Sequence, residues 1–495
     1  MLNKNNEILQ IILLLSIIFI VFLIPLAHST YYFGYDPFFY LMMSKEVIYT
    51  GNISPAYNHP PLYPTIFANL SILSGIDVFY LIRYSLPFII IFLGISMYLF
   101  TKEIIKNHEI ALLATTFICL SSGYNSHWFY QFHVNFLEHR PAYLCWIFNI
   151  LFLYSLSKYL KSSNKNKLNF LIPGIFLAAS FFTYYFSGLF GALIFVATPI
   201  ILLIKTKNFK KIIKLFLPIF LVTFSIFFPF FLLNLGSILE IIEIEKPVIL
   251  KAREPLDYFI FLGVPAVLAI LGFLYAIYKK KYLIPVTLFI IIMLYAQTYW
   301  IPTQNKLHLT ELAIRELKIP TAFFAALAIF LIYKKLKKLR IARLTITTIL
   351  ILLSCVPAFY GILKTPPFTY TDKIPIYALN WLKEQPQGAF VSDELTTMFA
   401  YDFSGKNLIA GMYPKAGNFS LRREHQKYLK KELEEKRMIN QEANEIIKNY
   451  DIQYFMLNFT LWGRIKREIE YNPNWSKQYD SDEAAIFLNN QNQYK

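Results

Sequence analysis

Long apolar stretches alternate with short polar connections over residues 1–362 of the chain. About 20 apolar residues are enough for a helix to cross the hydrocarbon layer of a membrane. The pattern therefore predicts about eleven membrane helices. They fall near residues 8–27, 79–101, 109–123, 141–160, 168–184, 186–204, 215–233, 258–278, 283–300, 319–333 and 344–362. The first stretch is longer than the apolar core of a cleaved signal peptide, so we interpret it as a retained helix.

Lysine and arginine gather in alternate connections, which are residues 102–109, 161–167, 205–214, 279–282 and 334–343. Basic connections stay on the cytoplasmic side of a membrane. The sequence thus predicts a multi-pass cell-membrane protein with a cytoplasmic N-terminus. Four connections and the C-terminal region would lie outside, and the four are residues 28–78, 124–140, 234–257 and 301–318.

The C-terminal region, residues 363–495, loses the continuous apolar character. Helix-like and strand-like pieces alternate there, namely residues 371–385, 389–393, 396–405, 407–411, a long charged helix near 421–449, 452–458 and 484–489. Such an order predicts a small α/β domain. The predicted fold class is an α-helical polytopic membrane protein, residues 1–362, with an extracytoplasmic α/β domain, residues 363–495.

Composition agrees with a membrane protein and argues against a soluble protein and a nucleic-acid-binding protein. Of the 495 residues, 56% are hydrophobic and 18% aromatic, too many for a soluble chain to bury. The net charge is +17, and the basic residues that cause it lie in short clusters between apolar stretches, where they act as topology signals. This placement argues against a nucleic-acid partner. Cys119, Cys145 and Cys355 lie in apolar segments without a CxxC spacing, so neither a disulfide framework nor a zinc site is predicted.

The connection after the first apolar stretch contains the most distinctive pattern in the chain, DPFFYLMMSKEVIYTG followed by HPPLYP. Asp36 can cap a helix whose first position is Pro37, and Gly51 would end that helix. On local rules alone this is an interfacial helix, with Lys45 and Glu46 in water. Its apolar side chains would dip into the headgroups, and these are Phe38, Phe39, Leu41, Met42 and Met43.

An acid, an aromatic helix ending in glycine, and HPPLYP together resemble the first external loop of the GT-C glycosyltransferases. These include protein O-mannosyltransferases, lipid A aminoarabinose transferases and oligosaccharyltransferase catalytic subunits. The resemblance covers residues 1–200 in order and spacing. It implies transfer of a sugar from a polyprenyl-phosphate carrier to a lipid, glycan or protein acceptor, with Asp36 as the catalytic general base. One carboxylate can serve as both cap and base.

The second external connection ends in Glu138-His139-Arg140, just before Pro141. The resemblance implies that Glu138 is a second catalytic acid, which orients the acceptor or, in some members, a metal. From the residues alone, Glu138 and Arg140 could instead be an interfacial pair that anchors the helix end. Arg140, His139 and His59 are suited to bind the carrier phosphate. Tyr63, in the HPPLYP run, is assigned to substrate binding as well.

A late connection contains Glu311 and Arg315, which lie four apart and would pair on one helix face. The resemblance places a basic residue of such a loop near the carrier phosphate, so Arg315 is predicted to bind substrate. Glu311 is included beside it. No residue is assigned to a metal, and a divalent cation stays open as a cofactor.

The chain departs from known subfamilies in three ways. It lacks the WWDYG signature of oligosaccharyltransferases and a D-x-D pair in the second loop, and proline follows Asp36 where the mannosyltransferase and aminoarabinose transferase pattern has glutamate. The subfamily, and with it the sugar and acceptor, is left open. Besides donor and acceptor, the expected partners are membrane lipids. The alternative is a non-catalytic lipid-linked glycan transporter or assembly scaffold with a GT-C-like shape. Transporters place ionisable residues within their spans, and the predicted spans contain few, which favours an enzyme.

Overall fold

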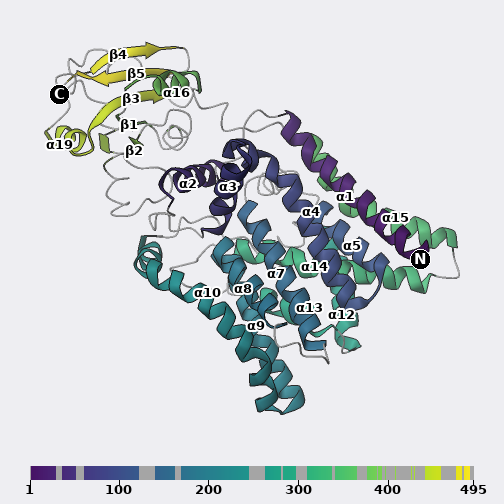
Figure 1. Cartoon of the computed structure of the whole chain (residues 1–495). Coiled ribbons are helices and arrows are strands. Elements are labelled where there is room, and N and C mark those ends of the chain that lie inside the picture. The colour runs from purple at the N-terminus through teal and green to yellow at the C-terminus, as the bar shows by residue number, and fades with distance from the viewer. Residues whose placement is uncertain are drawn as a thin grey trace.

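A computed structural model describes most of the helices and part of the C-terminal region. The described residues are 2–28, 36–51, 61–121, 140–161, 169–244, 262–279, 282–296, 309–336, 340–364, 376–386, 388–392, 396, 407–408, 425, 428–429, 441–458, 475–481 and 484–490. Figure 1 shows a bundle of helices with a small sheet beside one end. This is the mostly helical architecture that the apolar pattern predicts.

A helix lies in each of the eleven predicted apolar stretches. These are α1 (Leu2–His28), α4 (Val78–Ile105), α5 (His108–Leu120), α7 (Arg140–Lys161), α8 (Leu171–Thr183), α9 (Tyr185–Thr206), α10 (Phe209–Ile244), α12 (Val264–Tyr278), α13 (Leu283–Ala296), α14 (Leu309–Lys335) and α15 (Arg340–Lys364). Within the described residues, six helices are long and apolar enough to cross a membrane. The six segments are Asn5–Ile24, Val78–Ile105, Pro141–Lys161, Ser187–Thr206, Phe209–Pro229 and Glu316–Lys335. Eleven crossings remain a prediction.

Contacts at both ends of α1 and α4 show that these helices run antiparallel. The Arg83 guanidinium, near the start of α4, donates to the Leu26 carbonyl near the end of α1, with Nη2 and O 2.9 Å apart. At the other end, Lys102 Nζ lies 2.8 Å from Glu7 Oε2. We call the end of the bundle with Leu26 and Arg83 the loop end, and the end with Glu7 and Lys102 the basic end.

The basic end brings two of the predicted basic connections together. Lys161, at the end of α7, donates to the carbonyl of Glu103 at 2.9 Å and to its carboxylate at 3.2 Å. His108, at the start of α5, joins Tyr98 and Gln10 through its two ring nitrogens, each at 2.8 Å. Connections 102–109 and 161–167 therefore begin on the same side of the bundle.

Helix α14 is the centre of the bundle. Every residue from 316 to 329 is buried, and the helix packs against α5, α9, α12, α13 and α15. A helix segment that is buried on all faces lies in the interior of a large protein. Its closest contact is with α12, where a Cβ added to Gly272 would lie 2.0 Å from the Phe324 carbonyl oxygen. Only glycine allows the two backbones to approach this closely.

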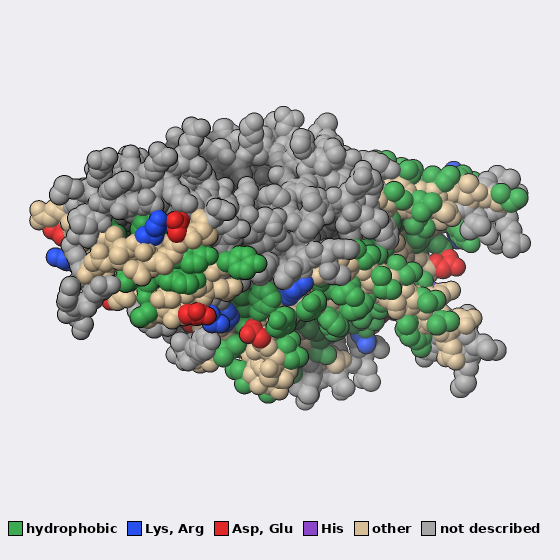
Figure 2. Space-filling model, turned by 90° about the horizontal axis from the view of Figure 1, so that it is seen from above, with side chains coloured by type: hydrophobic (Ala, Val, Ile, Leu, Met, Phe, Trp, Pro, Cys, Tyr) green, Lys and Arg blue, Asp and Glu red, His purple; other side chains and the backbone are tan. Residues whose placement is uncertain are grey.

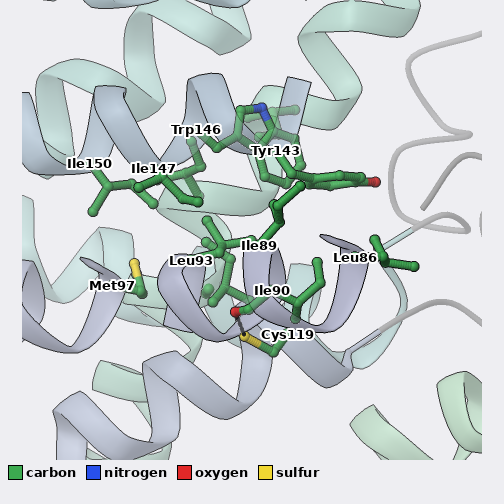
Figure 3. Packing of buried hydrophobic residues seen from close by; sticks show 14 of the residues in the cluster. Leu86, Ile89, Ile90, Leu93, Met97, Cys119, Tyr143, Trp146, Ile147 and Ile150 are labelled. Atoms are coloured by element: carbon green, nitrogen blue, oxygen red, sulfur yellow. Dashed lines mark hydrogen bonds between the residues drawn. The ribbon is translucent and has the colours of Figure 1, made fainter. Parts of the chain in front are cut away.

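Aliphatic and aromatic side chains of α4 and α7 fill the space beside α14. Figure 3 shows Tyr143 and Trp146 of α7 over Ile89 and Leu93 of α4. The Cys119 thiol donates to the Ile90 carbonyl at 3.6 Å. All three cysteines of the chain are buried and free.

Many apolar side chains face outward along α1, α9, α10 and α12. Figure 2 shows hydrophobic side chains in green over much of the described part of one face, with charged side chains scattered among them. A soluble protein rarely exposes so large an apolar surface, whereas a membrane protein presents it to lipid. The surface therefore agrees with the six apolar helices.

Two helix boundaries differ from the predictions by about ten residues. α14 begins at Leu309, so residues 309–318 are helical and extend the predicted span at 319–333. α10 runs on to Ile244, beyond the predicted span at 215–233. In both cases polar or charged residues continue a helix past the apolar stretch, because intrahelical hydrogen bonds do not require apolar side chains.

The C-terminal region contains a five-stranded sheet in the order β2-β1-β3-β5-β4. The elements are α16 (Ile376–Lys383), β1 (Ala389–Val391), β2 (Asn407–Leu408), α19 (Gln441–Asn449), β3 (Ile452–Asn458), β4 (Trp475–Asp480) and β5 (Ala484–Asn489). β1 is parallel to β2 and β3, while β5 is antiparallel to β3 and β4. Successive strand residues alternate between two apolar clusters, one with α16 and one with α19. Both faces are therefore covered.

The hydrophobic pattern predicts most of this sheet and misses one strand. β4 reads WSKQYD, and only Trp475 in it is buried, because β4 is an edge strand. The predicted piece at 396–405 and most of the long helix near 421–449 lie outside the described residues. The domain boundary near residue 362 stays a prediction.

Candidate active site

Two short helices occupy the connection between α1 and α4, at the loop end (Figure 1). The first, α2 (Asp36–Thr50), begins at the predicted acid. It ends before Gly51, whose φ of +68° and whose N–H bond to the Val47 carbonyl (3.0 Å) form a left-handed C-cap. The predicted helix from Asp36 to Gly51 is thus confirmed in its backbone, while the Asp36 side chain lies outside the description.

The apolar face of α2 packs inside the protein. Leu41 and Met43 are each 1% exposed, and Tyr40 is also buried. The prediction that Leu41 and Met43 dip into lipid headgroups is therefore wrong. Helices α3 and α4 cover this face, and a protein interior and a lipid layer attract apolar side chains alike. Lys45 and Glu46, expected in water, are only half-exposed.

The second helix, α3 (Leu62–Ser74), starts directly after the two prolines of HPPLYP. Tyr63 is fully buried, and its ring contacts the rings of Tyr40 and Phe67, with centroids 5.1 and 4.7 Å apart. The side chain thus joins α3 to α2. Its predicted role in substrate binding remains a prediction, and the tight packing shows that it at least fixes the helix that carries Asp36.

Arg83 is a residue of this region that the sequence reasoning missed. It is 8% exposed, and its guanidinium donates to the Leu26 carbonyl, one of the last carbonyls of α1 that no helical N–H can reach. Its guanidinium carbon also lies 5.1 Å from the centre of the Tyr84 ring. Arg83 therefore anchors the chain just before the Asp36 connection. A single arginine in an otherwise apolar stretch, FYLIRYSLPF, is the signal that could have identified it.

Replacing Arg83 by methionine is expected to reduce the free energy of unfolding by about 2 kcal/mol, because a buried carbonyl loses its charged donor. Arg83→Lys should cost less, since lysine retains a charged N–H donor on a flexible chain. Thermal unfolding of the purified protein in detergent measures both. Equal melting temperatures for wild type and Arg83→Met would show that the contact contributes nothing.

Other predicted site residues lie on helices that start at the loop end. Arg140 is the first residue of α7, next to Pro141, as predicted for a helix that starts there. Glu311 and Arg315 are both on α14, four residues apart, so their positions share one face of that helix. The side chains of these three residues, and the whole of His59, Glu138 and His139, lie outside the description.

A buried polar cluster connects the helices that carry these arginines. The Glu316 carboxylate on α14 accepts a hydrogen bond from the Trp146 indole N–H on α7, with Oε1 and Nε1 2.7 Å apart. The Ser187 hydroxyl on α9 donates to the same oxygen. Lys318, also buried, follows two residues later and lies near Cys119 of α5 and Cys355 of α15. Because the run ELAIRELK is rich in charge, the sequence suggests a solvated loop. The buried partners in the structure show instead that Glu316 and Lys318 belong to the core.

Backbone positions thus bring the ends of α1, α2, α4, α7, α9 and α14 together at the loop end. An acid, Asp36, and a cation, Arg140, are the first residues of α2 and α7, and a second cation, Arg315, lies in the second turn of α14. This combination can take a proton from a nucleophile and bind an anionic leaving group. Among the residues that the structure describes, no three acidic, histidine or cysteine side chains are grouped to hold a metal ion.

The comparisons by sequence identify no relative. No protein-family model matches the chain, and no curated protein matches it significantly. The comparison by structure gives a different result. ArnT from Cupriavidus metallidurans, solved with undecaprenyl phosphate, superposes with a TM-score of 0.64 and 9% identity, over 96% of this chain and 97% of ArnT. Its apo form gives a TM-score of 0.61 at 11% identity over the same shares.

The oligosaccharyltransferase from Archaeoglobus fulgidus, solved in complex with Zn and sulfate, is similar too. Its TM-score is 0.58 at 12% identity, over 96% of this chain and 73% of the archaeal one. ArnT is the lipid A aminoarabinose transferase, and both proteins are GT-C members. The chain has the GT-C fold.

The GT-C fold extends over nearly the whole chain, further than residues 1–200 that carry the sequence resemblance. The resemblance to aminoarabinose transferases and oligosaccharyltransferases is thereby confirmed at the level of fold. With identities of 9–12%, the common feature is the path of the backbone, and the subfamily is left open.

Proposed function

We propose that this protein is a membrane glycosyltransferase that moves a sugar from a polyprenyl-phosphate carrier to a lipid, glycan or protein acceptor. One observation carries the proposal. The GT-C fold covers the chain from end to end, and at its loop end a helix begins at Asp36 as the acidic loop motif predicts. ArnT, which has the same fold, was solved with undecaprenyl phosphate, a lipid of this class.

The reaction would be a single inverting displacement. The acceptor's oxygen or nitrogen attacks the anomeric carbon, the bond from that carbon to the phosphate oxygen breaks, and the polyprenyl phosphate leaves with the electron pair. Asp36 takes the proton of the acceptor as general base. Since the leaving phosphate is already a weakly basic anion, no strong general acid is required.

The remaining residues would bind and orient. Glu138 is proposed to orient the acceptor. Arg140 and Arg315, whose guanidinium groups suit phosphate oxygens, are proposed to bind the carrier phosphate. The other proposed substrate-binding residues are His59, His139, Glu311 and Tyr63. A divalent cation remains open as a cofactor, and the archaeal neighbour was solved with Zn.

The proposed topology has eleven crossings, with the basic end in the cytoplasm. Lys102, Lys106 and Lys161 lie at that end, as positive residues do on the cytoplasmic side. The loop end, and with it Asp36 and the C-terminal sheet, would then face outside. A cytoplasmic enzyme that uses soluble nucleotide sugars would need the opposite arrangement.

Mass spectrometry of the native host tests the function. We expect a strain with Asp36→Asn to lose one sugar from a single class of surface lipid, glycan or glycoprotein, relative to wild type at equal protein level. The missing mass identifies both sugar and acceptor. Identical profiles in the two strains would contradict the proposed function.

A transporter of lipid-linked glycans is the second candidate, because of two buried ionisable residues. Glu316 and Lys318 lie in a helix apolar enough to span a membrane, although the predicted spans seemed almost free of charge. Transporters use such residues. Flipping of a labelled polyprenyl-phosphate sugar across liposomes, without transfer of its sugar, would favour this candidate.

A further inference from the structure

Glu316 is a carboxyl group buried deep in the bundle. It is 2% exposed and lies within the segment Glu316–Lys335, which is apolar enough to span a membrane. Burying a carboxyl group away from water is costly unless hydrogen bonds compensate. Trp146 and Ser187, each 2% exposed, supply donors from two other helices to one carboxylate oxygen. An ionisable group kept at this cost in a membrane helix indicates a function.

The same residues belong to a wider network in the N-terminal halves of α7 and α9. Asn149 of α7 donates to the Ser187 carbonyl at 2.8 Å. Cys145 of α7 donates to the Ser180 carbonyl of α8 at 3.2 Å. A Cβ at Gly191 would lie 2.6 Å from the Asn149 side-chain oxygen, so α7 and α9 are in close contact. Four helices, α7, α8, α9 and α14, are therefore joined through directional bonds.

Trp146 combines both kinds of contact. Its ring packs edge-on against Tyr143, with centroids 5.0 Å apart, among the apolar side chains of α4. In Figure 3 the indole nitrogen points away from α4. Packing thus fixes the apolar part of the Trp146 ring. Its N–H is directed away from α4 and donates its hydrogen bond to Glu316.

The network involves the two helices that carry Arg140 and Arg315 of the proposed phosphate site. Arg315 precedes Glu316 on α14. Arg140 is six residues before Trp146 on α7, about 9 Å along the helix at 1.5 Å per residue. A bond between Trp146 and Glu316 therefore sets how far apart the two arginine-bearing turns are.

We infer that Glu316 is a positioning residue, which through Trp146 and Ser187 holds α7 and α14 at the separation at which Arg140 and Arg315 bind one phosphate group. The inference rests on the proposed function. Loss of the bond between Trp146 and Glu316 would let the turns that carry Arg140 and Arg315 move apart. If these arginines bind the donor equally well in the ground state and in the transition state, their displacement raises KM and leaves kcat nearly unchanged.

Trp146→Phe is the first test, because it removes only the N–H donor and retains the ring. With undecaprenyl phosphate as the probe, we expect the Kd of the purified protein to increase about tenfold, and the donor KM likewise, with kcat changed by less than about threefold. Trp381→Phe, which removes an indole N–H from α16 of the C-terminal sheet region, is the matched control and should leave Kd unchanged.

Glu316→Gln and Glu316→Leu form the second pair. Glutamine retains the oxygen that accepts both hydrogen bonds, so its Kd should stay close to wild type, whereas leucine should weaken binding about tenfold. Melting temperatures are recorded for every variant. Unchanged Kd values for Trp146→Phe and Glu316→Leu, or equal losses in the glutamine and leucine variants, would overturn the inference, even if melting temperatures fall.

The two proposals fail in different ways. If wild type binds undecaprenyl phosphate and transfers sugar, while the Glu316 and Trp146 variants do so equally well, only the positioning role is wrong. Absence of both binding and transfer in wild type would contradict the proposed function itself.

Discussion

Asp36→Asn is expected to reduce sugar transfer by about 10³-fold while the protein remains folded. Asparagine caps a helix as well as aspartate does, so α2 should keep its N-terminus at residue 36. It cannot accept a proton at neutral pH, so the acceptor would have to attack without a base. The substitution therefore separates the two roles that one carboxylate can have at this position.

The measurement is transfer by purified protein in liposomes, with polyprenyl-phosphate sugars extracted from the native host as donors. Asp77→Asn is the matched control. Asp77 is exposed and caps α4 by accepting the Phe79 N–H at 2.8 Å, which asparagine can also do. Equal, full transfer activity in both variants would show that Asp36 is a helix cap only and that another group acts as the base.

Gly272→Ala should have the largest effect on folding. The added Cβ would lie 2.0 Å from the Phe324 carbonyl oxygen and 2.8 Å from its carbon, and these are backbone atoms that cannot rotate away. Inserting a methyl group into a packed core costs about 1–3 kcal/mol, and a clash with backbone belongs at the upper end or above. We expect a large loss of folded protein, because α12 must separate from α14, the central helix.

The folded fraction is measured by the yield of the monodisperse peak in size-exclusion chromatography and by thermal unfolding. Gly94→Ala is the control, since a Cβ there meets only side-chain atoms of Thr115, Cys119 and Leu15, at 3.2–3.3 Å. These side chains can shift by a few tenths of an ångström. A Gly272→Ala variant as stable as Gly94→Ala would contradict the close packing of α12 on α14.

Local signals made part of the fold predictable. Pro37 and Gly51 determine the two ends of α2 through backbone geometry, which does not depend on the rest of the chain. The apolar stretches were predictable for a similar reason, because a membrane helix must be apolar along its own length. No charged residue marks the break between α8 and α9 at Tyr184, which lies where the predicted stretches 168–184 and 186–204 meet.

Features that depend on distant partners were not predictable. The charges in ELAIRELK resemble a solvated loop, and Trp146 and Ser187, which bury Glu316, are 170 and 129 residues away. Leu41 and Met43 suit lipid and protein interior alike, so the sequence could not decide between the two. In the candidate site, local rules were enough to predict where α2 begins (Asp36) and where α7 begins (next to Pro141). The anchoring role of Arg83 could be recognised only from its contact with Leu26 in the structure.

The central place of α14 has a consequence for the biogenesis of the protein. Alone in a bilayer, this helix would lose the protein partners that surround Glu316 and Lys318, which lie at the start of its apolar segment. α7 and α9, which provide the hydrogen-bond donors for Glu316, are synthesised earlier in the chain. Both donor helices are therefore complete before α14 is made, and a ribosome that stalls before residue 309 would leave a bundle without its central helix.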